Sequence, residues 1–261
     1  MKFCDMPYER IDVKAATEAL DAAAERLSAA KTIEEAERAF SEREKIISHV
    51  QTMSTIAYIR HTVNTLDEFY EKENDFNDEN APLIEQSEQK FTEAMLESPL
   101  RAQLEEKYGK LMFVNAELSR RCFSPAIIPQ LQEENTLSSE YQKRISPAQI
   151  EFKNEKLSLS QIGAYKENAE RDTRRAAYEA ESGFYMAHAD ELDRIFDSLV
   201  KCRTRIAKKL GFNTFTELAY CRQTRNCYDA GDVSAFRSRI VRDIVPVVCR
   251  LKKMQKKRIG I

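Results

Sequence analysis

The sequence predicts an all-α fold of long antiparallel helices and helical hairpins, with one short β-hairpin near residues 149–160. Only six glycines and seven prolines occur in 261 residues, so few residues would interrupt a helix. Apolar residues recur at helical spacing through most of the chain, and Ser, Thr or Asp often precede these stretches, as is typical of N-caps. Apolar residues make up 42% and charged residues 32%, which suits a buried core beneath a solvated surface.

Two long helices are expected at the start of the chain. The first covers 13–31, with Asp12 as its N-cap and alanines and leucines along one face. The pattern from Thr32 to Glu35 predicts a capping box, and the helix that it opens keeps its apolar period to about Asn64. Because almost no linker separates them, the two helices should pack as an antiparallel hairpin.

Helix signals continue through the middle of the chain. The acidic stretch 67–80 carries aromatic residues and is expected to be largely helical, and apolar residues follow Pro82 in the same phase. Ser98–Pro99 and Ser124–Pro125 each combine an N-cap residue with a proline suited to the first helical position. Each pair is therefore expected to open a further helix.

One segment departs from the helical period. Residues 149–153 and 156–160 alternate between apolar and polar side chains on either side of Asn154–Glu155. Alternation around a short polar centre predicts a β-hairpin, although Asn-Glu is a weaker turn than Asn-Gly. A helical pattern then resumes at Asp172 and is expected to continue, with breaks, to about Leu210.

The last part of the chain contains two more helix boundaries. Gly211 is expected as the residue that ends one helix, and Asn213 as the cap of the next. Asp229 or Asp232 is expected to cap a final helix with an apolar side, and Pro246 should kink that helix.

Charge and cysteine usage narrow the functional classes. The formal charge of −2 argues against nucleic-acid or membrane partners, and the basic run 237–258 lacks interleaved aromatic residues for stacking on bases. No run approaches the roughly 20 apolar residues of a membrane span. The six cysteines are scattered and the first residues lack the apolar core of a signal peptide, so we expect reduced thiols and a cytoplasmic protein.

Local motifs for catalysis or metal binding are missing from the sequence. None of His49, His61 and His188 belongs to a His-Glu-x-x-His motif, and each is expected to be a hydrogen-bonded helix residue. A calcium loop starting at Asp75 fails because asparagine replaces its glycine and Gln86 replaces its final glutamate. We therefore predict no catalytic and no metal-ligating residue in this chain.

Several stretches match one known family in order and spacing, and together they extend over essentially the whole chain: FCDMPYER (3–10), TMSTIAYIRHT (52–62), FYEKENDF (69–76), QIEF (149–152), RDTRRAAY (171–178), RIAKKLGF (205–212) and YCRQTRNCYD (220–229). On these stretches the sequence resembles the oligoendopeptidase F branch of the thimet-oligopeptidase-like zinc peptidases. The resemblance implies a mostly helical metalloendopeptidase that hydrolyses short peptides in a deep channel between two parts.

The resemblance also implies where the chemistry lies. In the family, zinc is bound by two histidines of His-Glu-x-x-His and by a downstream glutamate, while the glutamate of the motif polarises the attacking water. These residues belong to the carboxy-terminal half of the family, and this sequence resembles only the amino-terminal half. We therefore expect zinc in the parent enzyme, no zinc bound by this chain and no activity of this truncated chain alone.

Within this half, residues 1–145 are expected to form helical hairpins and a bundle. Residues 146–261 are expected to form the short hairpin and the helices of one channel wall. The resemblance suggests that Tyr220, Arg222, Arg225 and Tyr228 face the channel and donate hydrogen bonds to a peptide backbone or its terminal carboxylate. The alternative is that the two arginines pair with acids or with helix ends.

Two functions remain open at this point. The first is the amino-terminal part of a zinc oligoendopeptidase, and the second is a stand-alone helical module that binds peptides or a partner without catalysis. In both cases we expect an exposed apolar face that either the missing carboxy-terminal half or self-association would cover.

Overall fold

The computed structural model describes residues 2–260, and helices account for 79% of the chain, which confirms the all-α class. The first part contains a 3₁₀ turn followed by the long helices and their connections: η1 (Phe3–Asp5), α1 (Val13–Ala29), α2 (Ile33–Val63), α3 (Glu68–Leu96), α4 (Arg101–Tyr108), α5 (Lys110–Arg121), η2 (Pro125–Ile127) and α6 (Ile128–Ile145). The second part contains the hairpin and the remaining helices: β1 (Ile150–Phe152), β2 (Glu155–Leu157), α7 (Leu159–Tyr165), α8 (Arg171–Ala187), α9 (Ala189–Lys209), α10 (Phe215–Arg222), α11 (Ala230–Arg239), η3 (Ile240–Ile244) and α12 (Val245–Ile259).

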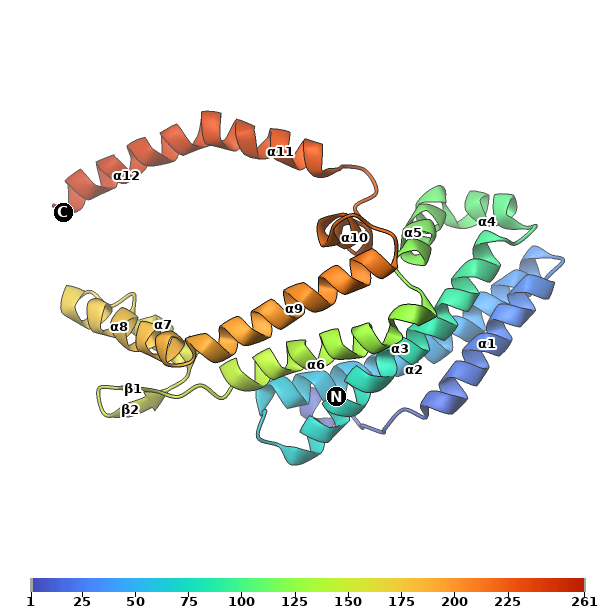
Figure 1. Ribbon diagram of the computed structural model, residues 1–261, viewed down its shortest axis with the longest axis horizontal. Coiled ribbons are helices and arrows are strands. Elements are labelled where there is room, and N and C mark those ends of the chain that lie inside the picture. The colour runs from blue at the N-terminus through green and yellow to red at the C-terminus, as the bar shows by residue number, and fades with distance from the viewer. Residues whose placement is uncertain (1, 261) are drawn as a thin grey trace.

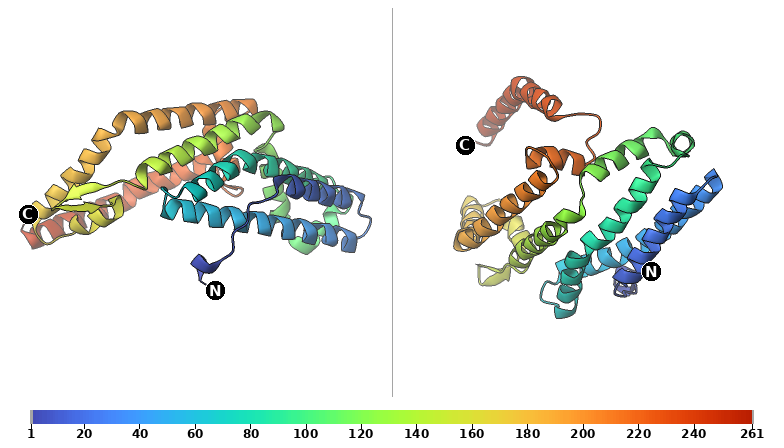
Figure 2. Two further views of the ribbon diagram at one scale, coloured as in Figure 1. Left: turned by 90° about the horizontal axis from the view of Figure 1, so that it is seen from below. Right: turned by 45° about the vertical axis from the view of Figure 1, so that its right-hand side comes forward.

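The long helices form a layer, with smaller elements at its ends (Figures 1 and 2). Helix α1 packs on both α2 and α3, α3 packs on α6, and α6 packs on α9. The β-hairpin lies with α7 and α8 at one end of the layer, and α4, α5 and α10 lie toward the other. From α10 the chain continues into α11, η3 and α12, which we call the carboxy-terminal arm and which runs back toward the end where α8 lies, above α9 and apart from it in Figure 1.

The first two helices form as their caps predict. The side chain of Asp12 accepts a hydrogen bond from the backbone N–H of Ala15 at 2.9 Å, and the hydroxyl of Thr32 accepts one from the N–H of Glu35 at 3.3 Å. The capping box is not reciprocal, because the carboxylate of Glu35 accepts from the N–H of Lys31 at 2.8 Å instead. Both helix starts therefore have at least one of their free N–H groups satisfied.

The two Ser-Pro pairs behave differently. Ser124 accepts from the N–H of Ala126 at 3.3 Å and opens a 3₁₀ turn that leads into α6, as expected. The prediction for Ser98–Pro99 is wrong by two residues, because α4 begins at Arg101. The Ser98 hydroxyl accepts from the N–H of Leu100 at 3.2 Å, so it closes a turn before the helix rather than capping it.

The β-hairpin is present, but its turn is displaced by one residue. Phe152 pairs with Glu155, so the turn residues are Lys153 and Asn154 rather than Asn154–Glu155. Their φ angles are 51° and 64°, the positive values that a two-residue type I′ turn requires. Asn adopts this region far more readily than Lys, so the sequence offered Asn154 as a turn residue but gave no sign that Lys153 would precede it in the turn.

The second strand is also shorter than expected, because a helix begins where the alternation was extended. The hydroxyl of Ser158 accepts from the N–H of Gln161 at 3.2 Å, and the side chain of Gln161 accepts from the N–H of Ser158 at 2.8 Å. This reciprocal capping box opens α7 and ends the hairpin at Leu157.

Helix α9 ends at a glycine, as predicted. Gly211 has φ of 83°, its N–H donates to the carbonyl of Lys208, and the N–H of Phe212 donates to the carbonyl of Ala207. This pair of bonds is the Schellman arrangement, which needs a left-handed residue at this point. The next cap is Thr214 rather than Asn213, because the hydroxyl of Thr214 accepts from the N–H of Glu217 at 3.3 Å.

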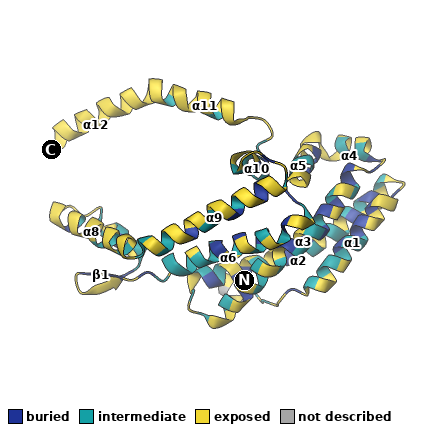
Figure 3. Cartoon of the chain, in the orientation of Figure 1, coloured by how far each residue is buried: buried dark blue, intermediate teal, exposed yellow. Residues whose placement is uncertain are grey.

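The carboxy-terminal arm is almost entirely exposed (Figure 3). Asp229 and Asp232 cap α11 together, in a reciprocal capping box. A turn of π-helix, η3, ends at Ile244, two residues before Pro246, where the sequence predicts a kink. No residue in the range 230–260 is buried, and the exposed apolar side chains are Phe236, Val241, Ile244, Val245, Val247, Val248, Leu251, Met254 and Ile259.

Among residues 2–260, none of the helices combines the length and apolar character needed to cross a membrane.

A buried histidine lies beneath a group of charged side chains between α2, α3 and α6. His61 is 1% exposed, and neither of its ring nitrogens has a hydrogen-bond partner within the described part of the chain. Burial lowers the pKa of His61, with a further lowering from Lys143, while Glu71, Asp75 and Asp78 act in the opposite direction. The folded protein therefore favours the neutral imidazole.

This environment predicts acid sensitivity. Because folding lowers the pKa of His61, the unfolded chain binds a proton more readily than the folded protein. The contribution of this histidine to the free energy of unfolding is therefore complete above its unfolded pKa of about 6.5 and falls as the pH drops below that value. From pH 7 to pH 5.5 the free energy of unfolding should fall, and the contribution of this one group to the slope is at most about 1.4 kcal/mol per pH unit. In urea titrations His61→Gln should flatten this slope. Equal slopes for His61→Gln and the wild type would contradict the assignment.

Candidate functional site

The four candidate residues lie on α10 and on the loop that leads to the arm. Tyr220 and Arg222 belong to α10, whereas Arg225 and Tyr228 belong to the loop. Leu218, fully buried, anchors α10 in a core that it shares with residues of α6 and α9. That core comprises Cys122, Phe123, Ile127, Leu131, Leu137, Cys202, Ile206, Ala207, Phe212, Leu218 and Cys221. The start of the arm is thus attached to the helical layer through α10.

Arg222 is part of an ion-pair network beneath α10. Its guanidinium donates to Glu134 Oε2 at 2.9 Å, and Arg203 donates to Glu134 Oε1 at 2.7 Å. Glu134 on α6 is 9% exposed, and the ring of Phe215 lies 5.6 Å and 6.0 Å from the guanidinium carbons of Arg203 and Arg222. The network joins α6, α9 and α10. Arg222 therefore pairs with an acid, which the sequence analysis gave as the alternative to facing the channel.

Arg225 has a different environment. Its guanidinium carbon lies 4.3 Å from the centroid of the Tyr220 ring and 5.7 Å from that of Tyr228. Its backbone N–H donates to the carbonyl of Tyr220 at 3.0 Å, and the preceding Thr224 has a φ of 50°. Asn226 ties the same loop to α5 by donating to the side chain of Asn115 at 2.5 Å. The two rings and these backbone contacts define where the cation lies.

The polar ends of this group have no partners in the structure. Among residues 2–260, the guanidinium of Arg225 makes no ion pair or hydrogen bond, and the hydroxyls of Tyr220 and Tyr228 make no hydrogen bond. Asp229, the nearest acid in sequence, accepts from the N–H groups of Gly231 and Asp232 in the cap of α11. We call Tyr220, Arg225 and Tyr228 the Arg225 cluster. Sequence matching found these residues but not the division between them and Arg222.

The histidines do not converge on a common point. His49 lies 3.3 Å from the carboxylate of Glu9, His61 is buried between three helices, and Nδ1 of His188 lies 2.8 Å from the carbonyl of Phe184. Within residues 2–260, no three His, Cys, Asp or Glu side chains are grouped so that they could hold a metal ion. Among the residues that the structure describes, this arrangement of donors does not fit a zinc site.

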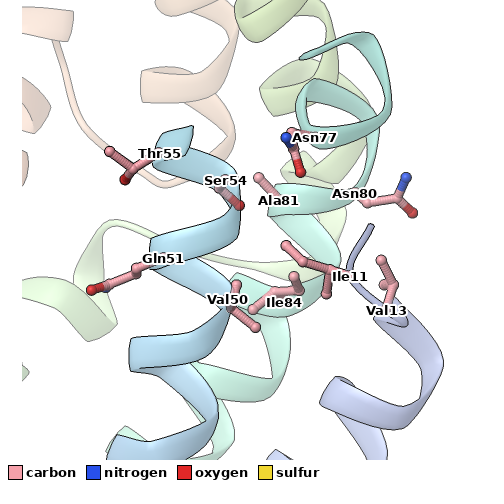
Figure 4. Close-up of a pocket in the computed structure, with 10 residues that line it drawn as sticks. All are labelled: Ile11, Val13, Val50, Gln51, Ser54, Thr55, Asn77, Asn80, Ala81 and Ile84. Carbon is pink, nitrogen blue, oxygen red and sulfur yellow. The ribbon is translucent and has the colours of Figure 1, made fainter. Parts of the chain in front are cut away.

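A half-open cavity of about 340 Å³ lies between the segment before α1 and helices α2 and α3 (Figure 4). The residues lining it are all uncharged: Ile11, Val13, Val50, Gln51, Ser54, Thr55, Asn77, Asn80, Ala81 and Ile84. Without a titratable group it offers no acid or base, so its surface suits packing or binding rather than catalysis. None of its lining residues belongs to the Arg225 cluster.

Comparison with known proteins places this fold. Residues 3–123 match the Peptidase M3 N-terminal domain. The whole chain superposes on PZ peptidase A solved with an inhibitor, with a TM-score of 0.97 and 40% identity, and covers 46% of that chain. It also superposes on an oligoendopeptidase F from Bacillus anthracis str. Ames, with a TM-score of 0.97 and 41% identity, and covers 48% of that chain. The chain is therefore similar over its whole length to oligoendopeptidase F-like peptidases, and residues 3–123 carry the M3 N-terminal domain pattern.

A further oligoendopeptidase F structure matches at a TM-score of 0.97 and 37% identity, again over all of this chain and 46% of the other. The comparison with curated proteins finds no match. This oligoendopeptidase F-like chain thus spans slightly less than half the length of the solved structures it matches, and it corresponds to their amino-terminal part. The domain match ends at Phe123. For α6 to α12 and the Arg225 cluster, the similarity to these structures therefore depends on the full-length superposition alone.

Proposed function

We propose that this chain is the amino-terminal part of a zinc-dependent oligoendopeptidase that hydrolyses short peptides. The observation that supports it most strongly is the superposition of the entire chain, at 37–41% identity, on oligoendopeptidase F structures and on PZ peptidase A. In this proposal residues 1–145 form the supporting bundle. Residues 146–261 contribute one wall of the peptide channel, with Tyr220, Arg225 and Tyr228 directed at the substrate and Arg222 holding α10 in place.

The proposal assigns peptide binding, rather than the hydrolytic step, to this chain. The zinc of the parent would polarise the scissile carbonyl and activate water. The separate positions of His49, His61 and His188 fit no such role, so the metal would be held elsewhere in the parent enzyme. Cys122, Cys202, Cys221, Cys227 and Cys249 are free, and burial raises the pKa of Cys122 and of Cys202 to about 11; free thiols suit the proposed cytoplasmic location.

The arm supplies the surface on which the remainder of the parent would pack. Ile244, Val248 and Leu251 lie on successive turns of η3 and α12, and 45–54% of each is exposed. Isolated exposed apolar residues are common, but a continuous run along a helix typically marks an interface. Self-association through this surface is the second candidate, in which the chain acts as a stand-alone helical module that binds a partner without catalysis.

The first test is hydrolysis by the 261-residue chain alone. With zinc and a quenched fluorescent peptide, the purified chain should release no fluorescence above a blank without protein, while circular dichroism shows that it is helical. A zinc endopeptidase of known activity, in the same buffer, establishes that the peptide and the metal concentration are adequate. Chelator-sensitive hydrolysis by the chain alone would refute the assignment of the metal to another part of the enzyme.

A further inference from the structure

The Arg225 cluster presents three unsatisfied hydrogen-bonding groups from one short segment. The guanidinium of Arg225 lies against the two tyrosine rings, and no carboxylate among residues 2–260 pairs with it. In contrast, both oxygens of Glu134 are used by Arg203 and Arg222. The neighbouring acids Asp229 and Asp232 are used in capping α11. The positive charge of Arg225 is thus uncompensated by any close acid.

This arrangement suits a carboxylate. A guanidinium presents two parallel N–H groups that match the two oxygens of a carboxylate, and such charge-assisted pairs are among the strongest hydrogen bonds in proteins. Stacking on aromatic rings restricts the guanidinium plane without using its N–H groups. Because the loop is also held by the bonds from Arg225 N–H to Tyr220 and from Asn226 to Asn115, less conformational freedom is lost on binding.

We propose that Arg225, held between Tyr220 and Tyr228, binds the carboxy-terminal carboxylate of a short peptide. The inference rests on the proposed function, and it specifies that this wall of the peptide channel recognises the carboxy-terminal end of the substrate. Every unmodified peptide carries one terminal carboxylate whatever its sequence, so a single receptor of this kind selects for a free end and not for a side chain. Arg222 is excluded from this role because Glu134 already occupies its guanidinium.

The test compares peptides that differ only in the charge and position of one carboxylate. N-acetyl-tetraalanine as the free acid, the same peptide as its amide, and N-acetyl-Ala-Ala-Asp-Ala-amide are titrated into the ¹⁵N-labelled chain at pH 7 and followed by NMR. The free acid should bind about tenfold more tightly than the amide, as expected for a hydrogen-bonded charge pair. The peptide with only the aspartate carboxylate should bind like the amide. Shifts should be largest in the 220–228 segment.

Variants separate this role from a general effect of charge. Arg225→Gln should reduce the preference for the free acid to less than twofold. Arg171→Gln removes the same charge from an exposed arginine that makes no ion pair in the described chain, and it should keep the preference. Tyr220→Phe and Tyr228→Phe retain the rings but remove the hydroxyls, so each should lower affinity for the acid severalfold without affecting affinity for the amide.

Two results would overturn the inference. The first is that the free-acid peptide and its amide bind equally, or that neither binds. This result would leave the proposed parent activity standing, because that activity is tested by hydrolysis assays. In the second, the aspartate peptide binds as tightly as the free acid, which would assign the cluster to acidic side chains instead of the terminus. A preference for the acid that survives Arg225→Gln would likewise place the receptor elsewhere.

Discussion

Replacing Glu134 by glutamine should lower the free energy of unfolding by about 2–3 kcal/mol, because two arginines lose their common charged acceptor. Glu134 is 9% exposed and bridges Arg203 on α9 to Arg222 on α10. Removing one member of a fully buried ion pair costs about 3–5 kcal/mol. The partial exposure of both arginines reduces that value, since water can solvate the released guanidinium groups.

The adjacent residue provides a matched control. Glu133 on α6 pairs with Arg205 on α9, but both side chains are more than two fifths exposed. Glu133→Gln should therefore change the free energy of unfolding by less than about 1 kcal/mol. Urea titrations of both variants, with equal m-values, give the comparison directly. Equal losses for the two variants would contradict the central position of Glu134 in joining α10 to the helical layer.

Much of the fold could be predicted because its signals are local. Asp12, Thr32 and Gly211 determine helix ends through hydrogen bonds to residues only a few positions away, so the sequence contains the whole interaction. The errors arise where two local signals compete. Ser158 continues the alternating pattern of a strand, and it also opens a capping box with Gln161. The helix forms because this box satisfies two backbone N–H groups at once, those of Ser158 and Gln161.

The candidate site was only partly predictable. The segment 220–228 was singled out by its resemblance to a known family, but which of its arginines is ion-paired depends on Glu134, which lies 88 residues before Arg222 in the chain. Glu134 stands in the middle of a polar helix, and no pattern distinguishes it from Glu133 beside it. Only the packing of α6 against α9 and α10 decides which of the two glutamates is buried.

The proposed parent activity leads to the prediction with the largest expected effect. This chain, mixed with a separately expressed carboxy-terminal part of the matched Bacillus anthracis oligoendopeptidase F, should form a complex through the arm. A quenched peptide should then be hydrolysed in the presence of zinc, although neither part hydrolyses it alone. Covering the exposed apolar side chains of η3 and α12 supplies the free energy of association, at about 25 cal/mol for each Å² of apolar surface removed from water.

The arm can be tested within the same mixture. Ile244→Asp combined with Leu251→Asp places two charges on this surface and should reduce both complex formation and hydrolysis at least tenfold. Val63, an exposed apolar residue at the end of α2, provides the control, and Val63→Asp should leave both unchanged. Loss of complex with both kinds of variant would point to a general effect on folding, which circular dichroism would reveal.

The most direct measurement is zinc-dependent peptide hydrolysis by the two parts together. We expect hydrolysis that requires both polypeptides, disappears with a chelator and returns with zinc. A stable complex of the two folded parts that leaves the peptide intact in excess zinc would contradict the assignment of this chain to a zinc oligoendopeptidase.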